Sequence, residues 1–140
     1  MQREKLKELY LKYKLKETDI FNIKFGQTTK PIITRSGIET IQNALQITVS
    51  YKLQKLSDDN KHAVVLGTGK IIKQLENGNQ TVQTCESFGE VAPYNNTNSY
   101  PVCMAEKRCL SRIVIKMSGL ANYGVYGEDE ADAFKRSNNQ

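Results

Sequence analysis

The sequence contains no tryptophan, one histidine and three cysteines, and it has no long hydrophobic run. A membrane-spanning helix needs roughly 18–20 consecutive apolar residues, and charged residues interrupt every apolar stretch of this chain well before that length. The N-terminal segment MQREKLKELYLKYKLKE carries charges throughout and lacks the apolar stretch and small-residue cleavage site of a secretory signal. We therefore expect no contact with a membrane and a cytoplasmic location.

The cysteines, Cys85, Cys103 and Cys109, are odd in number and match neither a zinc site nor a redox pair in their spacing. Structural zinc takes four ligands, and the single histidine, His62, is far from any cysteine in the sequence. His62 also accompanies no recognisable nucleophile motif. We therefore expect reduced, mostly buried thiols and no metal.

Two further segments are candidates for enzymatic chemistry, and we reject both. The segment LGTGKI differs from a phosphate-binding loop, because that loop needs two glycines with four residues between them and then Lys before Ser or Thr, whereas Ile71 follows Lys70. We interpret it as a strand with paired glycines. The acidic run near the C-terminus is the other candidate, as a Mg²⁺ site, and consists of Glu128, Asp129, Glu130 and Asp132. Metal ligands usually come from separate elements, whereas these residues are almost consecutive. We interpret this run as a solvated tail or a contact to a basic neighbour. With both candidate segments rejected, we expect that the protein is not an enzyme.

The length of 140 residues suits one domain with a single hydrophobic core. We place this domain at residues 18–127, between a basic N-terminal helix over 1–17 and an acidic and polar tail over 128–140. In the N-terminal helix, apolar residues recur at the i, i+3, i+4, i+7 spacing of one face: Leu6, Leu9, Tyr10 and Tyr13. This helix either docks with a solvated basic face or contacts nucleic acid or another subunit.

The remainder of the chain predicts an α+β fold. Gly26, a threonine pair and Pro31 break regular structure before a second helix, whose start is marked by Ser36 and Glu39 at the spacing of a capping box. Alternating apolar and polar residues then indicate a strand over 47–54.

Two more strand-like runs flank Asn77-Gly78, the strongest short hairpin signal, because both residues tolerate the positive φ of a type I′ turn. The prediction is an antiparallel three-stranded β-meander with its hairpin at Asn77-Gly78, packed by a long helix and flanked by N-terminal helices. We expect the open edges of this sheet to favour self-association.

The long helix is expected from about Met104 to Leu120, with Gly119 as its cap. Its cations follow at four-residue steps and form one ridge of Arg108, Arg112 and Lys116. This ridge lies opposite the apolar side chains that would pack on the sheet. Residues 107–116 include four cations and no acid, and the whole chain carries a net charge of +5. Such a face is either simply solvated or, because like charges at this spacing repel, a partner for a polyanion.

From Ser99 the sequence reads SYPVCMAEKRCLSRIVIKMSGL, followed by YGEDEA. This stretch resembles the YPVxMAEKRAxxRAVLxLxGL…GEDE signature of phage-encoded single-strand annealing and recombination proteins, which are similar in turn to the Rad fifty-two superfamily. The resemblance is clearest over about residues 99–130 and extends loosely to 32–130. Cys109 and Ile113 stand where small residues often occur in that family.

The resemblance implies an ATP-independent protein that binds and anneals single-stranded DNA in phage-type recombination and needs no cofactor. It implies a homo-oligomeric ring or filament whose groove, between sheet and helix, holds the phosphate backbone with the bases outward. A phage exonuclease or the host single-strand-binding protein is a further candidate partner, and a phage protein would act in the host cytoplasm.

The resemblance assigns DNA contacts by position to Arg108, Arg112 and Lys116, with Lys107 beside them. Lys70 and Lys73 on the hairpin are lining candidates by geometry, and Arg35 is either a phosphate contact or an ordinary surface arginine. A second class of function stays open, namely a non-enzymatic adaptor or oligomeric scaffold of the same fold that binds an acidic protein partner.

Overall fold

The computed structural model describes residues 2–93 and 100–131. Within these ranges the chain forms three α-helices, six strands and three 3₁₀ turns, in the order α1 (Gln2–Lys12), η1 (Glu17–Asp19), β1 (Ile20–Phe25), β2 (Thr28–Ile33), α2 (Arg35–Leu45), β3 (Thr48–Leu56), β4 (Ala63–Gln74), β5 (Gln80–Val91), α3 (Pro101–Met117), η2 (Leu120–Tyr123), β6 (Tyr126–Gly127) and η3 (Glu128–Glu130). The predicted α+β class is confirmed, but there are two three-stranded sheets and not one. No described helix is long and apolar enough to cross a membrane.

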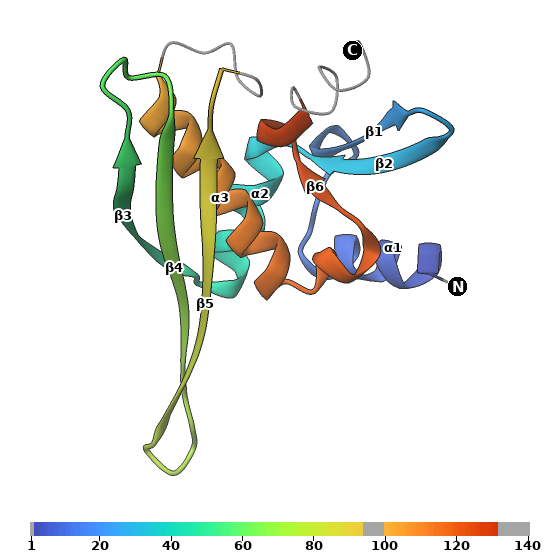
Figure 1. Ribbon diagram of the computed structural model, residues 1–140. Coiled ribbons are helices and arrows are strands. Elements are labelled where there is room, and N and C mark those ends of the chain that lie inside the picture. The colour runs from blue at the N-terminus through green and yellow to red at the C-terminus, as the bar shows by residue number, and fades with distance from the viewer. Residues whose placement is uncertain (1, 94–99, 132–140) are drawn as a thin grey trace.

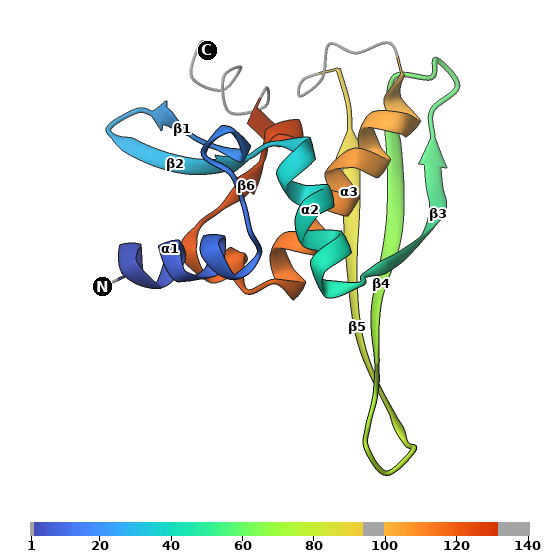
Figure 2. The same cartoon turned by 180° about the vertical axis from the view of Figure 1, so that it is seen from behind.

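The larger sheet has the antiparallel order β3-β4-β5, and α3 lies against it with α2 on the far side of α3 (Figures 1 and 2). Glycines on the sheet allow this close approach. A Cβ added to Gly89 would lie 1.9 Å from the Ala105 carbonyl oxygen, and one added to Gly67 would lie 2.3 Å from Cys109 Sγ. The LGTGKI segment lies within strand β4, as the strand interpretation predicted. Its two glycines face α3.

The β4-β5 hairpin continues beyond the end of α3 as an arm that projects from the body (Figure 1). We define the arm as residues 72–84, all of which are exposed. Its turn differs from the predicted type I′ turn, because Gly78 has a positive φ of 85° and Asn77 does not. The Gly78 amide donates to the Leu75 carbonyl and the Leu75 amide to the Asn79 carbonyl, so the loop has three residues with glycine at the left-handed position.

The second sheet, β1-β2-β6, occupies residues that the sequence analysis left partly without regular structure. Strands β1 and β2 form a hairpin whose turn is Gly26-Gln27, with Gly26 at φ 63°. Pro31 is compatible with β2 because the parallel pairing with β6 begins only at Ile32. The prediction that Pro31 breaks regular structure is therefore wrong, since this residue lies inside β2.

The helix ends follow local chemistry. The α2 helix begins two residues earlier than predicted from Ser36, because Thr34 is its N-cap and accepts a 3.1 Å hydrogen bond from the Gly37 amide. The α3 helix begins at Pro101, a residue type suited to a first turn. Gly119 follows its end with φ 85°, so the predicted glycine cap is confirmed.

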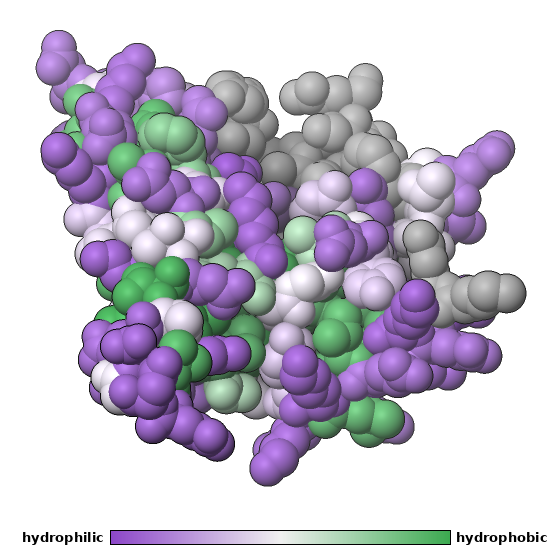
Figure 3. Space-filling model, turned by 90° about the horizontal axis from the view of Figure 1, so that it is seen from below, coloured by the Kyte–Doolittle hydropathy of each residue, from purple (hydrophilic) through white to green (hydrophobic). Residues whose placement is uncertain are grey.

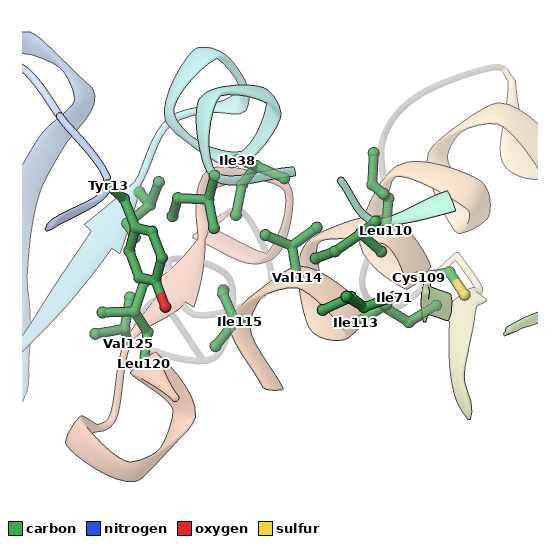
Figure 4. Close-up of a cluster of buried hydrophobic side chains, with 13 residues drawn as sticks. Tyr13, Ile38, Ile71, Cys109, Leu110, Ile113, Val114, Ile115, Leu120 and Val125 are labelled. Carbon is green, nitrogen blue, oxygen red and sulfur yellow. The ribbon is translucent and has the colours of Figure 1, made fainter. Parts of the chain in front are cut away.

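The core runs on both sides of α3. The close-up in Figure 4 extends from Tyr13, Leu120 and Val125 at one end to Ile71, Ile113 and Cys109 at the other. Tyr13 Oη donates a 2.9 Å hydrogen bond to the Ser118 carbonyl and so fixes the segment after α1 to the end of α3. Of the three thiols only Cys109 is buried, which corrects the expectation that most would be.

Candidate nucleic-acid interface

The three cations of the predicted ridge share one side of α3 but differ in environment. Arg108 is only 2% exposed, so the prediction that it faces solvent is wrong. Its Nε donates to the Asp129 carbonyl and its Nη1 to the Glu90 carbonyl, each at 3.0 Å. The segment after β6 packs over this part of α3. A helical wheel considers one helix alone and therefore cannot predict such a contact.

The covering element is η3, and its acidic side chains bind this side of the molecule. Glu128 accepts a hydrogen bond from the Arg35 amide, Asp129 accepts one at 3.0 Å from Ser111 Oγ, and Glu130 forms an ion pair with Arg112. Of the two interpretations of the acidic run, the structure therefore shows the contact to basic neighbours. The rest of the predicted tail, residues 132–140, lies outside the described residues.

Arg112 and Lys116 are the ridge residues that reach solvent. The Arg112 side chain is 39% exposed despite its pairing with Glu130, and its Nη1 also donates to the Phe88 carbonyl at 2.7 Å. Lys116 is exposed, and its Nζ donates to the neutral Ser87 Oγ at 3.2 Å. Across residues 2–93 and 100–131 no carboxylate forms an ion pair with Lys116, so its charge is uncompensated there.

The two hairpin lysines lie on opposite faces of the sheet. Residues of β4 alternate in burial, and the inward series ends at Ile71, which packs in the core. Lys73 continues this series on the side of α3, whereas Lys70 belongs to the outer face. The structure thus brings Lys73 to the same side as Lys116, and it separates Lys70 from them.

The other two predicted residues are less available. Lys107 is half-buried on α3. Arg35 is the first residue of α2, and its Nε pairs with Glu39 at 3.1 Å. Its Nη1 is buried and has no hydrogen-bond partner among the described atoms.

Lys116 lies between two surface hollows. One, of about 250 Å³, lies between α3 and the segment around β6 and is also lined by Arg112. The other, of about 200 Å³, lies against β5 beside Gln83 and Cys85. We refer to them as the β6 hollow and the β5 hollow. The C-terminal end of α3 therefore has a concave surface that carries the Lys116 ammonium, and Lys73 lies on the same face of the sheet.

The site offers binding groups, and we identify no catalytic constellation in it. Within the described ranges no group of three or more His, Cys, Asp and Glu side chains could hold a metal ion. Burial raises the pKa of the Cys109 thiol to about 11, so the thiol is protonated at neutral pH and donates to the Ser87 carbonyl.

Comparisons with known proteins add no assignment. No family model matches the chain, and a search of curated proteins found no match. What the sequence analysis missed is the docking of η3 on the basic residues. A signal for it was present, because a helical stretch with cations and no acid is followed about ten residues later by an acidic run with no cation.

Proposed function

We propose that the protein binds single-stranded DNA, and anneals complementary strands, through the basic surface at the C-terminal end of α3. The observation that carries this proposal is Lys116, an exposed cation with no acidic partner in the described structure that lies between two hollows. Lys73 adds positive charge on the same side of the sheet, and Arg112 adds a half-exposed guanidinium that Glu130 pairs with.

This arrangement suits a flexible polyanion. Phosphates bound by lysine and arginine release counterions, which favours binding without regard to sequence. A single strand can also turn its bases into hollows that a duplex, with its bases paired, cannot use. The mechanism needs neither nucleotide hydrolysis nor a metal.

Each protomer offers few phosphate contacts, so we propose that several protomers act together. Strands β3 and β5 are the two edges of the larger sheet. Strand β3 can pair with another chain, whereas on β5 the Phe88 and Glu90 carbonyls already accept hydrogen bonds from α3. In a ring or filament one strand would cross many copies of the basic surface, and multivalency would raise the affinity.

An oligomeric scaffold or adaptor is the second candidate. It is favoured by apolar side chains that are about half exposed on the outer face of the larger sheet: Ile72, Val82 and Phe88. Figure 3, seen from below, shows hydrophobic patches among hydrophilic side chains at the surface. Such side chains fit a protein partner better than a phosphate backbone.

Fluorescence anisotropy with three polyanions separates the candidates. We expect tightest binding to a dT 30-mer, weaker binding to a 30-base-pair duplex and weakest binding to poly-glutamate at equal ionic strength. Lys116→Gln should weaken dT binding several-fold, while the matched control Lys24→Gln, which removes an exposed charge from β1, should not. Poly-glutamate binding as tightly as dT would favour the adaptor.

A further inference from the structure

The β6 hollow combines an apolar lining with cations in a way that the phosphate backbone alone does not require. Ile115 and Val125 are buried residues of its wall, and Tyr126 is a further lining residue. Lys30 Nζ lies 4.7 Å from the centroid of that ring, a cation–π contact that helps to fix its orientation. Arg112 and Lys116, both solvent-accessible, line the same hollow. Glu130 lines it as well and forms an ion pair with Arg112, so Lys116 is the cation of this lining without a carboxylate partner in the described ranges.

The size and lining of the hollow select a small, flat, apolar group that carries an adjacent anion. Its volume of about 250 Å³ lies below the range of roughly 300–1,000 Å³ typical of sites for drug-sized ligands. A nucleobase has such a shape, and in a nucleic-acid strand the sugar that carries it is linked to a phosphodiester. Lys116 is placed to receive that phosphate, because it lines this hollow and the β5 hollow alike.

We infer that the β6 hollow takes one base of the bound strand, turned inward against Tyr126, while the neighbouring phosphate contacts Lys116. This inference rests on the proposed function and deepens it, since it gives the bound strand an orientation. The strand would then continue toward the β5 hollow, where the Gln83 amide offers hydrogen bonds. At least one base per protomer is thereby turned inward, in contrast to a groove that holds all bases outward.

Two oligonucleotides with the same phosphates test this orientation. A dT 30-mer has bases to insert, and a 30-mer of tetrahydrofuran abasic sites has none. Because stacking of one base on an aromatic side chain contributes about 1–3 kcal/mol, the wild-type protein should bind dT roughly 5- to 100-fold more tightly than the abasic strand.

Filling the hollow should abolish that preference. Ala121 is exposed and lines the hollow, so Ala121→Leu adds volume there at little cost to the fold. We expect this variant to bind both strands with the affinity that the wild-type protein has for the abasic strand. Asn122→Leu, at the next exposed position and outside the lining, should retain the preference and serves as the matched control. Urea unfolding of both variants checks the fold.

The outcomes separate this inference from the proposed function. Equal, salt-dependent binding of dT and abasic strands by the wild-type protein would overturn the base site and leave DNA binding intact. A preference that persists in Ala121→Leu would place the base elsewhere and also overturn it. If neither strand binds, the proposed function fails and the inference with it. A peptide of alternating Glu and Tyr that binds the wild-type protein, but not Ala121→Leu, in place of dT would assign the hollow to an acidic protein.

Discussion

Arg108 and Lys116 occupy the same side of α3 two turns apart, yet their surroundings give them opposite roles. Arg108 is enclosed between β5 and η3, where its guanidinium donates to two backbone carbonyls. Lys116 lies where η3 no longer covers the helix, and its ammonium reaches solvent. Residue type and spacing are alike, so the difference comes from the element that packs on each position.

Arg108 should therefore act mainly on stability. Replacing it with Met keeps the length of the side chain but leaves the Glu90 and Asp129 carbonyls without these donors. We expect a loss of about 2–4 kcal/mol in the free energy of unfolding, measured by urea titration. Lys116→Gln should change that free energy by less than about 0.5 kcal/mol. An Arg108→Met protein that unfolds like the wild type but fails to bind DNA would contradict this division.

Cys109 should make the fold sensitive to alkali. Its pKa is raised by burial from the ordinary value of 9.0 to about 11, so above pH 9 the unfolded chain loses this proton before the folded one does. Stability is therefore full below pH 9 and falls as pH rises toward 11, by about 1–2 kcal/mol. Burial also raises the pKa values of Tyr10, Tyr13 and Tyr51, which adds the same trend above pH 10.

Urea unfolding at pH 8, 9 and 10 isolates the thiol, since the tyrosines contribute only later. Cys109→Ser retains a buried donor for the Ser87 carbonyl and should flatten the decline between pH 9 and 10. Cys103→Ser, at an exposed position, should leave it as in the wild type. An equally steep decline in Cys109→Ser would assign the effect to other groups.

At the scale of elements, α3 is held by the glycines of the sheet beneath it. A Cβ on Gly89 would meet backbone atoms of Ala105 and Cys109, which cannot move independently. A Cβ on Gly67 would clash with side-chain atoms of Cys109 and Ile113 and not with backbone. Gly89→Ala should thus destabilise by about 3 kcal/mol or more and Gly67→Ala by about 1–2 kcal/mol. Thermal unfolding of both would settle the order, and a milder effect at Gly89 would contradict the packing described.

The elements that local patterns specify were predictable, and those that depend on distant partners were not. Strict alternation indicated β3, the strand-like runs on either side of Asn77-Gly78 indicated β4 and β5, and Gly119 marked the end of α3. The β1-β2 hairpin was missed because Pro31 was interpreted as a break, although its compatibility depends on where β6 pairs. The site was predictable in its residue types, but the burial of Arg108 depends on η3, which binds from about twenty residues away.

At the scale of the whole molecule, the basic surface lies at the end of α3, and the arm projects from the body beside it, with Lys73 and the β5 hollow at its base (Figure 1). The exposed Ile72 and Val82 are directly paired across β4 and β5, on the outer face of the arm. An apolar cross-strand pair in this position is suited to contact with another protomer.

Self-association should therefore depend on the arm. The double variant Ile72→Thr, Val82→Thr retains β-branched residues suited to a strand and should shift the wild-type oligomer toward monomer in light scattering at tens of micromolar. Leu11→Thr removes an even more exposed apolar side chain, 76% exposed, from α1 and should leave the oligomer unchanged. A wild-type protein that is strictly monomeric, with and without DNA, would refute assembly.

The central claim, that single-stranded DNA binds through the end of α3, is tested most directly by the salt dependence of the affinity for a dT 30-mer. For the wild-type protein the logarithm of the binding constant should fall linearly with the logarithm of the salt concentration, with a slope of about 0.7 per neutralised phosphate. Lys116→Gln should reduce that slope by about 0.7 per protomer, and Glu130→Gln, which releases Arg112 from its ion pair, should raise the affinity. Binding that does not respond to salt, or a slope that Lys116→Gln leaves unchanged, would contradict the account.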